Sequence, residues 1–227
     1  SSFWEARFIP DFNHNAVVET VLVISRDISE QRRSEGQIRK LSHLYQVLSN
    51  INQILVRRLA PEQIFKQAAE ICVRDGGFKF AWVGLLDKSS GQISLAAQTL
   101  GYEHYSEQVL LNVNSGARFG PTRLALASAQ CIVCNDVEHE ERLELLKREL
   151  ALQAGFGAFA VFPFLVHGVA LGVFSLYSDE VNFFDEDEIW LLNELAGNIS
   201  YALEASEKDR RLSQAASVIE STREAIM

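Results

Sequence analysis

The sequence predicts an α+β fold that combines antiparallel β-hairpins with amphipathic helices, beginning with a hairpin and a long entry helix and ending with a long exit helix. Two apolar runs, rich in β-branched and aromatic residues, meet at a turn formed by His167 and Gly168, which is typical of a hairpin. A helix with a capping box, Asp185 and Glu188, follows. The entry segment has no proline between residues 11 and 60, so a long helix can form there.

The N-terminal segment, residues 3–26, predicts a β-hairpin. The strand-like sequences FWEARFI and VVETVLVI flank residues 10–15, which are rich in turn-forming types. Asp27 can cap the entry helix, and Glu30 can reach back to the cap. We expect this helix to cover about residues 28–58, roughly 45 Å, with Gly36 as its weakest position. Its apolar residues recur every three or four positions, at Ile38, Leu41, Leu44, Tyr45, Val47, Leu48, Ile51, Ile54 and Leu55.

Shorter elements are expected between the two long helices. Pro61 suits the first turn of a helix that ends at the Gly76-Gly77 pair. Residues 101–120, rich in Tyr, Ser and Asn, are expected to be irregular. The remaining expectations are a hairpin at residues 80–86 and 93–100, a short helix at 121–128, a short strand at 131–135 and a surface helix at 140–153. The exit helix begins at Asp185 and meets no breaker before about residue 216.

The composition indicates a folded globular protein, with 48% hydrophobic and 22% charged residues. A net charge of −9 disfavours a nucleic-acid partner, because such binding surfaces are usually basic. The longest apolar run is interrupted by His167 and glycines, which suits strands rather than a membrane span. The first residues lack the features of a secretory signal, and the three cysteines form no even framework. A cytoplasmic location is therefore expected.

Residues from about 42 to 205 resemble a GAF domain. The similarity rests on FAWVGLLDKSSGQISLAA, on the GP-x-x-x-A-x-A segment at residues 120–127, on Asn135-Asp136 after a short strand, on the run at residues 162–178 and on FFDEDEIWLLNELA. The resemblance implies an antiparallel sheet with helices on both faces. It also implies that residues 101–120 and the following helix form a lid over the sheet.

The flanks resemble parts of PAS domains. Residues 4–33 are similar to the last two strands of a PAS domain and its D-I-S-E-Q exit motif, and residues 218–227 are similar to the opening of another. The resemblance implies a bacterial sensor protein of the histidine kinase or cyclic-di-GMP enzyme type. It divides the chain into a PAS hairpin (1–28), an entry helix (29–59), a GAF domain (60–205) and an exit segment (206–227). Because a lone hairpin is marginally stable in water, we expect it to pack against the coil or a partner chain.

The cysteine pattern offers an alternative function. Cys131 and Cys134 form a C-x-x-C motif, which occurs in redox and zinc sites. Residues three apart in a strand point to opposite faces, and Cys72 lies on the core face of a predicted helix. A structural role is therefore favoured, with a thiol-based redox enzyme or sensor using Cys131 and Cys134 as the alternative. The five histidines are scattered, so neither a metal site nor catalytic residues are expected.

GAF domains with known ligands provide further comparisons. The Cys-His pair that holds a bilin is absent. Phe183, Asp187 and Glu188 match half of a cyclic-nucleotide pattern, but helix capping explains these carboxylates. Some GAF-like proteins reduce free methionine sulfoxide with three cysteines, but the sequence around Cys131 does not match theirs. Haem and flavin stay open, so the cofactor is unknown.

We therefore expect a non-catalytic sensory or regulatory module that relays the state of a ligand or of the upstream PAS domain through dimeric helices. The candidate ligand-binding residues point inward beneath the expected lid: Trp82, Tyr102, Phe119, Arg123, Cys134 and Phe162. A homodimer is expected through the apolar stripes of the entry and exit helices, which comprise Leu41, Leu44, Leu48, Ile51, Leu55, Ile199 and Leu203.

Overall fold

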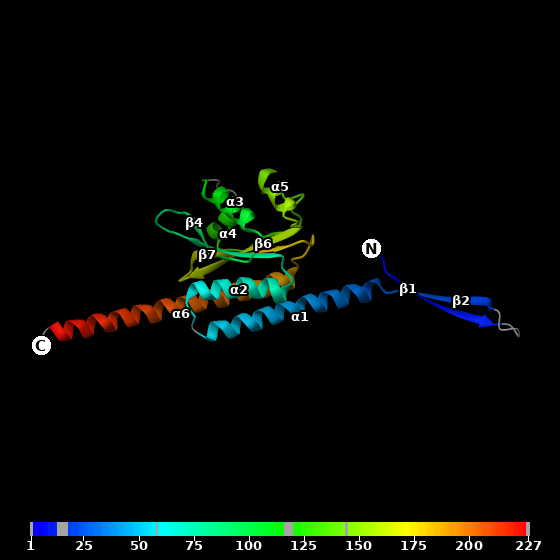
Figure 1. Ribbon diagram of the computed structural model, residues 1–227, viewed down its shortest axis with the longest axis horizontal. Helices are drawn as coiled ribbons and strands as arrows, with labels where there is room; N and C mark the ends of the chain where they lie inside the picture. The colour runs from blue at the N-terminus through cyan, green and yellow to red at the C-terminus, as the bar shows by residue number, and fades with distance from the viewer. Residues whose placement is uncertain (1, 13–17, 58, 116–119, 144, 226–227) are drawn as a thin grey trace. The chain divides into compact units, whose positions relative to one another are not determined.

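The structure is a computed structural model that describes the chain except for residues 1, 13–17, 58, 116–119, 144 and 226–227 (Figure 1). It comprises two compact units, Ser1–Ser42 and His43–Met227. Among the residues described, no helix combines the length and the apolar character needed to cross a membrane.

The first unit is an antiparallel hairpin followed by the beginning of a helix. β1 (Trp4–Phe12) pairs with β2 (Val18–Asp27), with an irregularity in register between Asp11 and Phe12. α1 (Ser29–Val56) follows and continues into the second unit. Asp27 caps its start, because its Oδ1 accepts a hydrogen bond of 2.9 Å from the Ser29 N–H. The predicted hairpin and entry helix are confirmed.

The second unit is built on a five-stranded antiparallel sheet of order β4-β3-β7-β6-β5. The strands are β3 (Phe80–Leu86), β4 (Ile93–Gln98), β5 (Ile132–Cys134), β6 (Ala158–Val166) and β7 (Val169–Ser178). His167 and Gly168 connect β6 to β7 with φ angles of 52° and 75°. Two consecutive left-handed residues are what a tight hairpin turn requires, so this predicted turn is confirmed.

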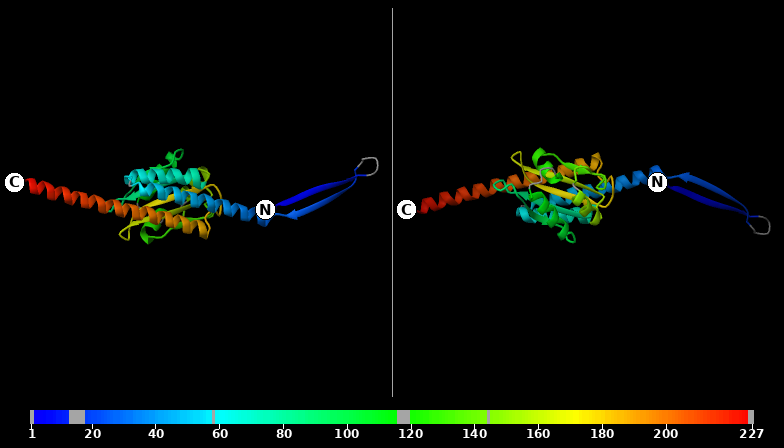
Figure 2. Two further views of the ribbon diagram at one scale, coloured as in Figure 1. Left: turned by 90° about the horizontal axis from the view of Figure 1, so that it is seen from below. Right: turned by 90° about the horizontal axis from the view of Figure 1, so that it is seen from above.

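Helices cover both faces of the sheet, as the fold class predicts (Figure 1). On one face, α2 (Pro61–Gly76) packs on β3 and β4, and α6 (Glu186–Ala225) packs on β6. From His43 onward, α1 lies over these two helices (Figure 2). On the other face, α4 (Pro121–Ser128) crosses β5, β6 and β7, and α3 (Glu103–Asn114) packs on β4 and on α5 (Leu145–Gln153).

Each face of the sheet has its own apolar core. On the α2 side, the rings of Phe65 and Phe164 lie 5.5 Å apart. The buried residues of α1 and α6 belong to this core: Leu44, Val47, Ile51 and Ile54 of α1, and Leu192, Leu195, Ile199 and Leu203 of α6. On the α4 side, the core contains Phe80, Trp82, Phe159 and Tyr177. The sheet therefore mechanically connects two helical layers.

The start of α6 is firmly attached to the sheet. Asp185 and Glu188 form the predicted capping box, in which Glu188 Oε2 accepts from the Asp185 N–H at 2.8 Å and Asp185 Oδ1 accepts from the Glu188 N–H at 3.1 Å. Asn135, directly after β5, bonds Phe184 twice through its side-chain amide, donating to the carbonyl at 2.7 Å and accepting from the N–H at 2.9 Å.

Three predicted boundaries differ from the structure. Residues 101–120 are not irregular throughout, because α3 occupies Glu103–Asn114. Tyr105, Val109 and Val113 of α3 recur every four residues and pack against the core, which overrides the weak helix propensity of the segment. The expected helix at residues 140–153 begins only at Leu145. The exit helix continues to Ala225, because no glycine or proline interrupts it after Gly197.

Candidate functional site

A small cavity lies on the sheet face that α3, α4 and α5 cover. Its volume is about 50 Å³, enough for one or two water molecules at roughly 30 Å³ each. All three helices and strands β6 and β7 contribute to its walls, which include Tyr105, Val113, Thr122, Leu150, Phe159 and Tyr177. The cavity is therefore formed jointly by the helical cover and by the two central strands.

Aromatic side chains fill most of the space beside this cavity. The rings of Phe80, Tyr105, Phe156 and Tyr177 lie 4.7–6.1 Å apart. The Trp82 indole N–H donates a hydrogen bond to Tyr177 Oη at 3.3 Å. Burial raises the pKa of Tyr105 and that of Tyr177, so both phenols stay neutral at physiological pH. The two tyrosines therefore offer neutral hydroxyls to a ligand, and Lys147 of α5 adds a charged side chain to the lining.

A buried hydroxyl lies on the sheet below α4. Ser175 is fully buried, and its Oγ has no hydrogen-bond partner among the described residues. In the sheet register Ser175 is opposite Trp82 on one side and Val161 on the other, so its side chain points to the cavity face. Because an unpaired buried hydroxyl is costly, a small polar group placed beside Val161 would be stabilised here.

The structure brings only part of the predicted ligand set together. Trp82 and Cys134 belong to the core beside the cavity, and Tyr102 packs against it. Arg123 instead joins the end of α3 to the loop between β3 and β4, because its guanidinium donates to the carbonyls of Val113 at 3.1 Å and Gly91 at 2.8 Å.

Phe162 and Phe119 stand apart from this set. Phe162 is two residues from Phe164 in β6 and therefore shares the α2 side of the sheet, so its expected position beneath the lid is wrong. Phe119 lies outside the described residues. Sequence reasoning missed Tyr105 and Tyr177, although the alternation in β7 places Tyr177 on the same face as Val173 and Ser175.

The cysteines are not arranged as a reactive pair. The Asn193 amide of α6 donates to Cys131 Sγ at 3.7 Å, on one side of the sheet. Cys134 is buried in the core on the other side, and burial raises the pKa of its thiol to about 12. Burial likewise raises the pKa of Cys72. Within the described part of the chain, no group of His, Cys, Asp and Glu could hold a metal ion.

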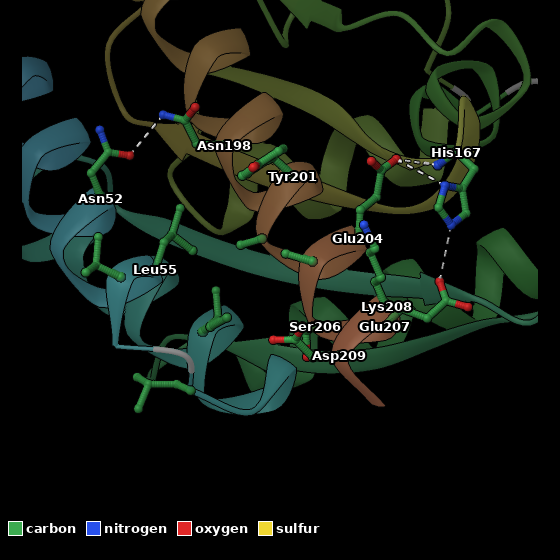
Figure 3. Close-up of a pocket in the computed structure, with 15 residues that line it drawn as sticks. Asn52, Leu55, His167, Asn198, Tyr201, Glu204, Ser206, Glu207, Lys208 and Asp209 are labelled. Atoms are coloured by element: carbon green, nitrogen blue, oxygen red, sulfur yellow. Dashed lines mark hydrogen bonds and ion pairs between the residues drawn. The ribbon is translucent and has the colours of Figure 1, made fainter. Parts of the chain in front are cut away.

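The turn between β6 and β7 is bonded to the middle of α6 (Figure 3). Ser200 Oγ accepts a hydrogen bond from the Leu165 N–H at 2.9 Å. The Glu204 carboxylate accepts one from the His167 N–H. The His167 ring lies between two carboxylates, with Nδ1 3.9 Å from Glu204 and Nε2 3.8 Å from Glu207. These contacts link the strands that line the cavity to α6.

Four of the seven residues predicted to form a dimer interface cannot do so. Leu44, Ile51, Ile199 and Leu203 are at most 6% exposed, because they pack inside the chain itself. Leu41, Leu48 and Leu55 are partly exposed. The apolar period of a helix identifies its buried face, but it does not show whether that face is covered by the same chain or by a second one.

A wide groove of about 1280 Å³ runs between the end of α1 and α6 (Figure 3). Leu55 and Val56 of α1 line one side, and Tyr201 and Ala202 of α6 line the other. Above them, the Asn198 amide donates to Asn52 Oδ1 at 2.9 Å and joins the two helices. This groove is larger than the cavity on the other side of the sheet, and it is open to solvent.

Comparison with known proteins defines the family. The family model described as a GAF domain matches residues 59–204, and no curated protein matches the sequence. The structure is similar to a free methionine-R-sulfoxide reductase from Neisseria meningitidis, with a TM-score of 0.60 and 19% identity over 75% of this chain and 93% of that one. A second similar structure is a domain of a protein named as a two-component sensor histidine kinase, from Sinorhizobium meliloti 1021. Its TM-score is 0.56, with 19% identity over 69% of this chain and 99% of that one.

A third similar structure is the phycoerythrobilin-bound GAF domain of a cyanobacterial phytochrome, with a TM-score of 0.57 and 15% identity over 74% of this chain and 97% of that one. At these identities the structures report on the fold alone. The family model covers well over half of the sequence and includes every strand of the five-stranded sheet. The chain belongs to the GAF domain family.

Proposed function

We propose that this chain is a non-catalytic sensory or regulatory module of a signal-transduction protein, and that α6 transmits a change in the sheet to whatever follows the domain. Membership of the GAF family supports a regulatory role, and the same fold occurs in a protein named as a sensor histidine kinase. The cavity on the α4 side is the proposed sensing site.

The observation that carries the proposal is the bonded connection between β6–β7 and α6. Phe159, Val161 and Tyr177 of these strands line the cavity, while Leu165 and His167 at the same hairpin bond to α6. A ligand that separates or twists β6 and β7 would therefore move Ser200 and Glu204. α6 continues well past residue 204, where the family match ends, to Ala225, so the displacement has a continuous helix to follow.

The test uses a cavity-filling substitution in place of a ligand. Val161→Ile adds one methylene beside the cavity, and amide hydrogen exchange is measured along the whole chain. We expect altered exchange in β6–β7 and also in α6 around residues 198–209. In a Ser200→Ala background, the response of the strands should persist while that of α6 weakens. Val23→Ile, which adds the same methylene at an exposed position of β2, is the matched control. If hydrogen exchange in Val161→Ile changes only in β6–β7 and not in α6, the proposed transmission from the sheet to α6 is refuted.

We further propose that the flanks belong to PAS domains, with boundaries at 1–28, 29–59, 60–205 and 206–227. The exposed apolar residues of the hairpin support this assignment: Trp4, Phe8 and Phe12 share one face and are each more than half exposed. A contiguous apolar surface of this kind marks an interaction site. In a longer protein, the remaining strands of a PAS sheet would cover it and would pass their state to α1.

A thiol reductase is the alternative, because two structures with this fold are free methionine-R-sulfoxide reductases. The positions of Cys131 and Cys134 on opposite sides of the sheet argue against a reactive pair, since a disulfide needs Cα atoms within about 7 Å and converging Cβ vectors. The purified chain, given free methionine-R-sulfoxide and dithiothreitol, should show no turnover above buffer. Turnover that disappears in Cys134→Ser would establish the reductase instead.

A further inference from the structure

The cavity that α3, α4 and α5 cover has mostly apolar walls and one charged side chain. Among the described residues that line it, Lys147 of α5 is the single charged one, and none is an Asp or a Glu. The chain as a whole carries 30 acidic and 21 basic residues, so the charge of this lining is opposite to that of the protein. Because a carboxylate in the wall would repel an anion and an ammonium group attracts one, the lining favours a negatively charged ligand.

The start of α4 adds hydrogen-bond donors to the same cavity. No described side chain caps the first turn of this helix, so its first N–H groups have no partner within the helix. Gly120, Pro121 and Thr122 all line the cavity. The Lys147 ammonium group lies here too, because a Cβ placed on Gly120 would be 3.9 Å from its Nζ. A helix N-terminus beside an ammonium group is a favourable environment for an anion.

Buried hydroxyl groups at this cavity have protons without an acceptor among the described residues. Thr122 is 5% exposed, and its side chain forms no hydrogen bond with any described residue. On the opposite wall, Tyr177 Oη accepts from the Trp82 indole at 3.3 Å and is hydrogen-bonded to the Tyr105 hydroxyl. Two phenols that share one hydrogen bond use one of their two protons, so the other O–H needs an acceptor. Since an unpaired buried donor is costly, these hydroxyls favour a ligand that accepts hydrogen bonds.

We propose that the cavity binds the carboxylate of a short-chain organic acid. Its oxygens accept from the Thr122 hydroxyl, from the first N–H groups of α4 and from the remaining phenol proton, while Lys147 balances its charge. Its carbon end contacts the apolar part of the lining, which comprises Val109, Val113, Leu150, Phe159 and Val161. A volume of about 50 Å³ limits the ligand to about three or four non-hydrogen atoms, the size of acetate. This inference rests on the proposed function, because it names the chemical class of ligand for the sensing site.

Binding of sodium acetate to the full chain is the first measurement. Amide NMR shifts are followed near neutral pH while acetate replaces chloride at constant ionic strength. A ligand this small should bind with a dissociation constant no tighter than roughly 40 µM, so millimolar concentrations are used. The shifts should concentrate in the first turn of α4 and in β6–β7. Acetamide, which has nearly the same shape but no charge, should bind at least about 10-fold more weakly.

Two substitutions separate binding from folding. Thr122→Val keeps the shape of the side chain and removes its hydroxyl, so the dissociation constant for acetate should rise at least about 5-fold. Because that hydroxyl has no partner among the described residues, the melting temperature should stay the same or rise, which a merely structural role would not allow. Lys147→Gln should weaken acetate binding at least about 10-fold. Thr20→Val, the same change at an exposed position of β2, is the matched control.

Any of three results would overturn the ligand class: acetate shifts that are absent or lie away from α4, acetamide that binds as tightly as acetate, or Thr122→Val that binds acetate as the wild type does. The transmission from the sheet to α6 is tested separately, because Val161→Ile fills the cavity without any ligand. No acetate binding together with a Val161→Ile response in α6 would reject the ligand class alone. Acetate binding without a Val161→Ile response in α6 would reject the transmission alone.

Discussion

The two long hairpins of this chain have the same length and opposite surroundings. β1–β2 and β6–β7 each pair a strand of nine residues with one of ten, in antiparallel register. Every residue of β1 is exposed, whereas none of β6 is. Both sequences are rich in β-branched and aromatic residues, which form strands in either setting. The difference shows that the contribution of a side chain to stability depends on the layers that cover the hairpin.

The largest difference is expected for matched aromatic truncations. Phe164→Ala removes a fully buried ring from β6 and should lower the free energy of unfolding of the second unit by about 3–5 kcal/mol. Phe8→Ala, at a 67% exposed position of β1, should change it by less than about 0.5 kcal/mol. Urea denaturation followed by circular dichroism compares them. Equal losses would mean that the first hairpin is covered in solution.

A smaller effect should follow from adding a single methyl group. A Cβ at Gly172 in β7 would overlap the carbonyl oxygen of Gly84 and the ring of Phe164, so Gly172→Ala should cost about 1–3 kcal/mol of unfolding free energy. Gly36→Ala in α1 meets open space and should favour the helix by about 0.5–1 kcal/mol. Thermal unfolding of both variants would show shifts of opposite sign. A tolerated Gly172→Ala would indicate that β3 and β7 are less closely packed.

The smallest effect concerns how acidic pH changes stability at the β5 edge of the five-stranded sheet. Arg142 donates to the Val133 carbonyl of β5 at 2.6 Å and to Glu140. The hydrogen bond from Arg142 lowers the pKa of the Glu140 carboxyl from 4.5 to about 2. Because the folded-state pKa is the lower one, this stabilisation is present above about pH 5 and is lost as pH falls towards about 2.

Glu140→Gln should therefore make the free energy of unfolding less dependent on pH between about pH 5 and about pH 2. Near pH 7 the pH dependence of the unfolding free energy should change little. Tryptophan fluorescence during acid titration of both proteins measures this difference. The buried Trp82 reports on the sheet, whereas the exposed Trp4 reports on β1 and should respond far less. Identical acid transitions for wild type and Glu140→Gln would contradict the role of this ion pair.

The sequence predicted the elements whose signals are local. The turn at His167 and Gly168 and the capping box at Asp185 and Glu188 are specified by neighbouring residues, and both are confirmed. α3 was missed because its residues favour a helix only when Tyr105 and its neighbours can pack on the sheet. The helix propensities of the individual residues do not reveal tertiary packing of this kind.

The candidate site was harder to predict, for a related reason. Strand alternation separates Phe162 from Phe159 and Val161, but it does not say which set faces the lid. Likewise, α1 has two adjacent apolar stripes, one containing Leu44 and the other containing Tyr45, and both satisfy the same helical period. The choice in each case depends on which layer of the same chain covers the face, and this is settled only by the three-dimensional arrangement.

The double hydrogen bond between Asn135 and Phe184 makes the start of α6 a pivot. From Glu186 to Ala225 the helix has 40 residues, or about 60 Å at 1.5 Å per residue. A tilt of about 3° around that pivot would carry the far end sideways by about 3 Å over this length. A movement of about 1 Å where Ser200 contacts the sheet would thus become a displacement about three times larger at the far end of α6.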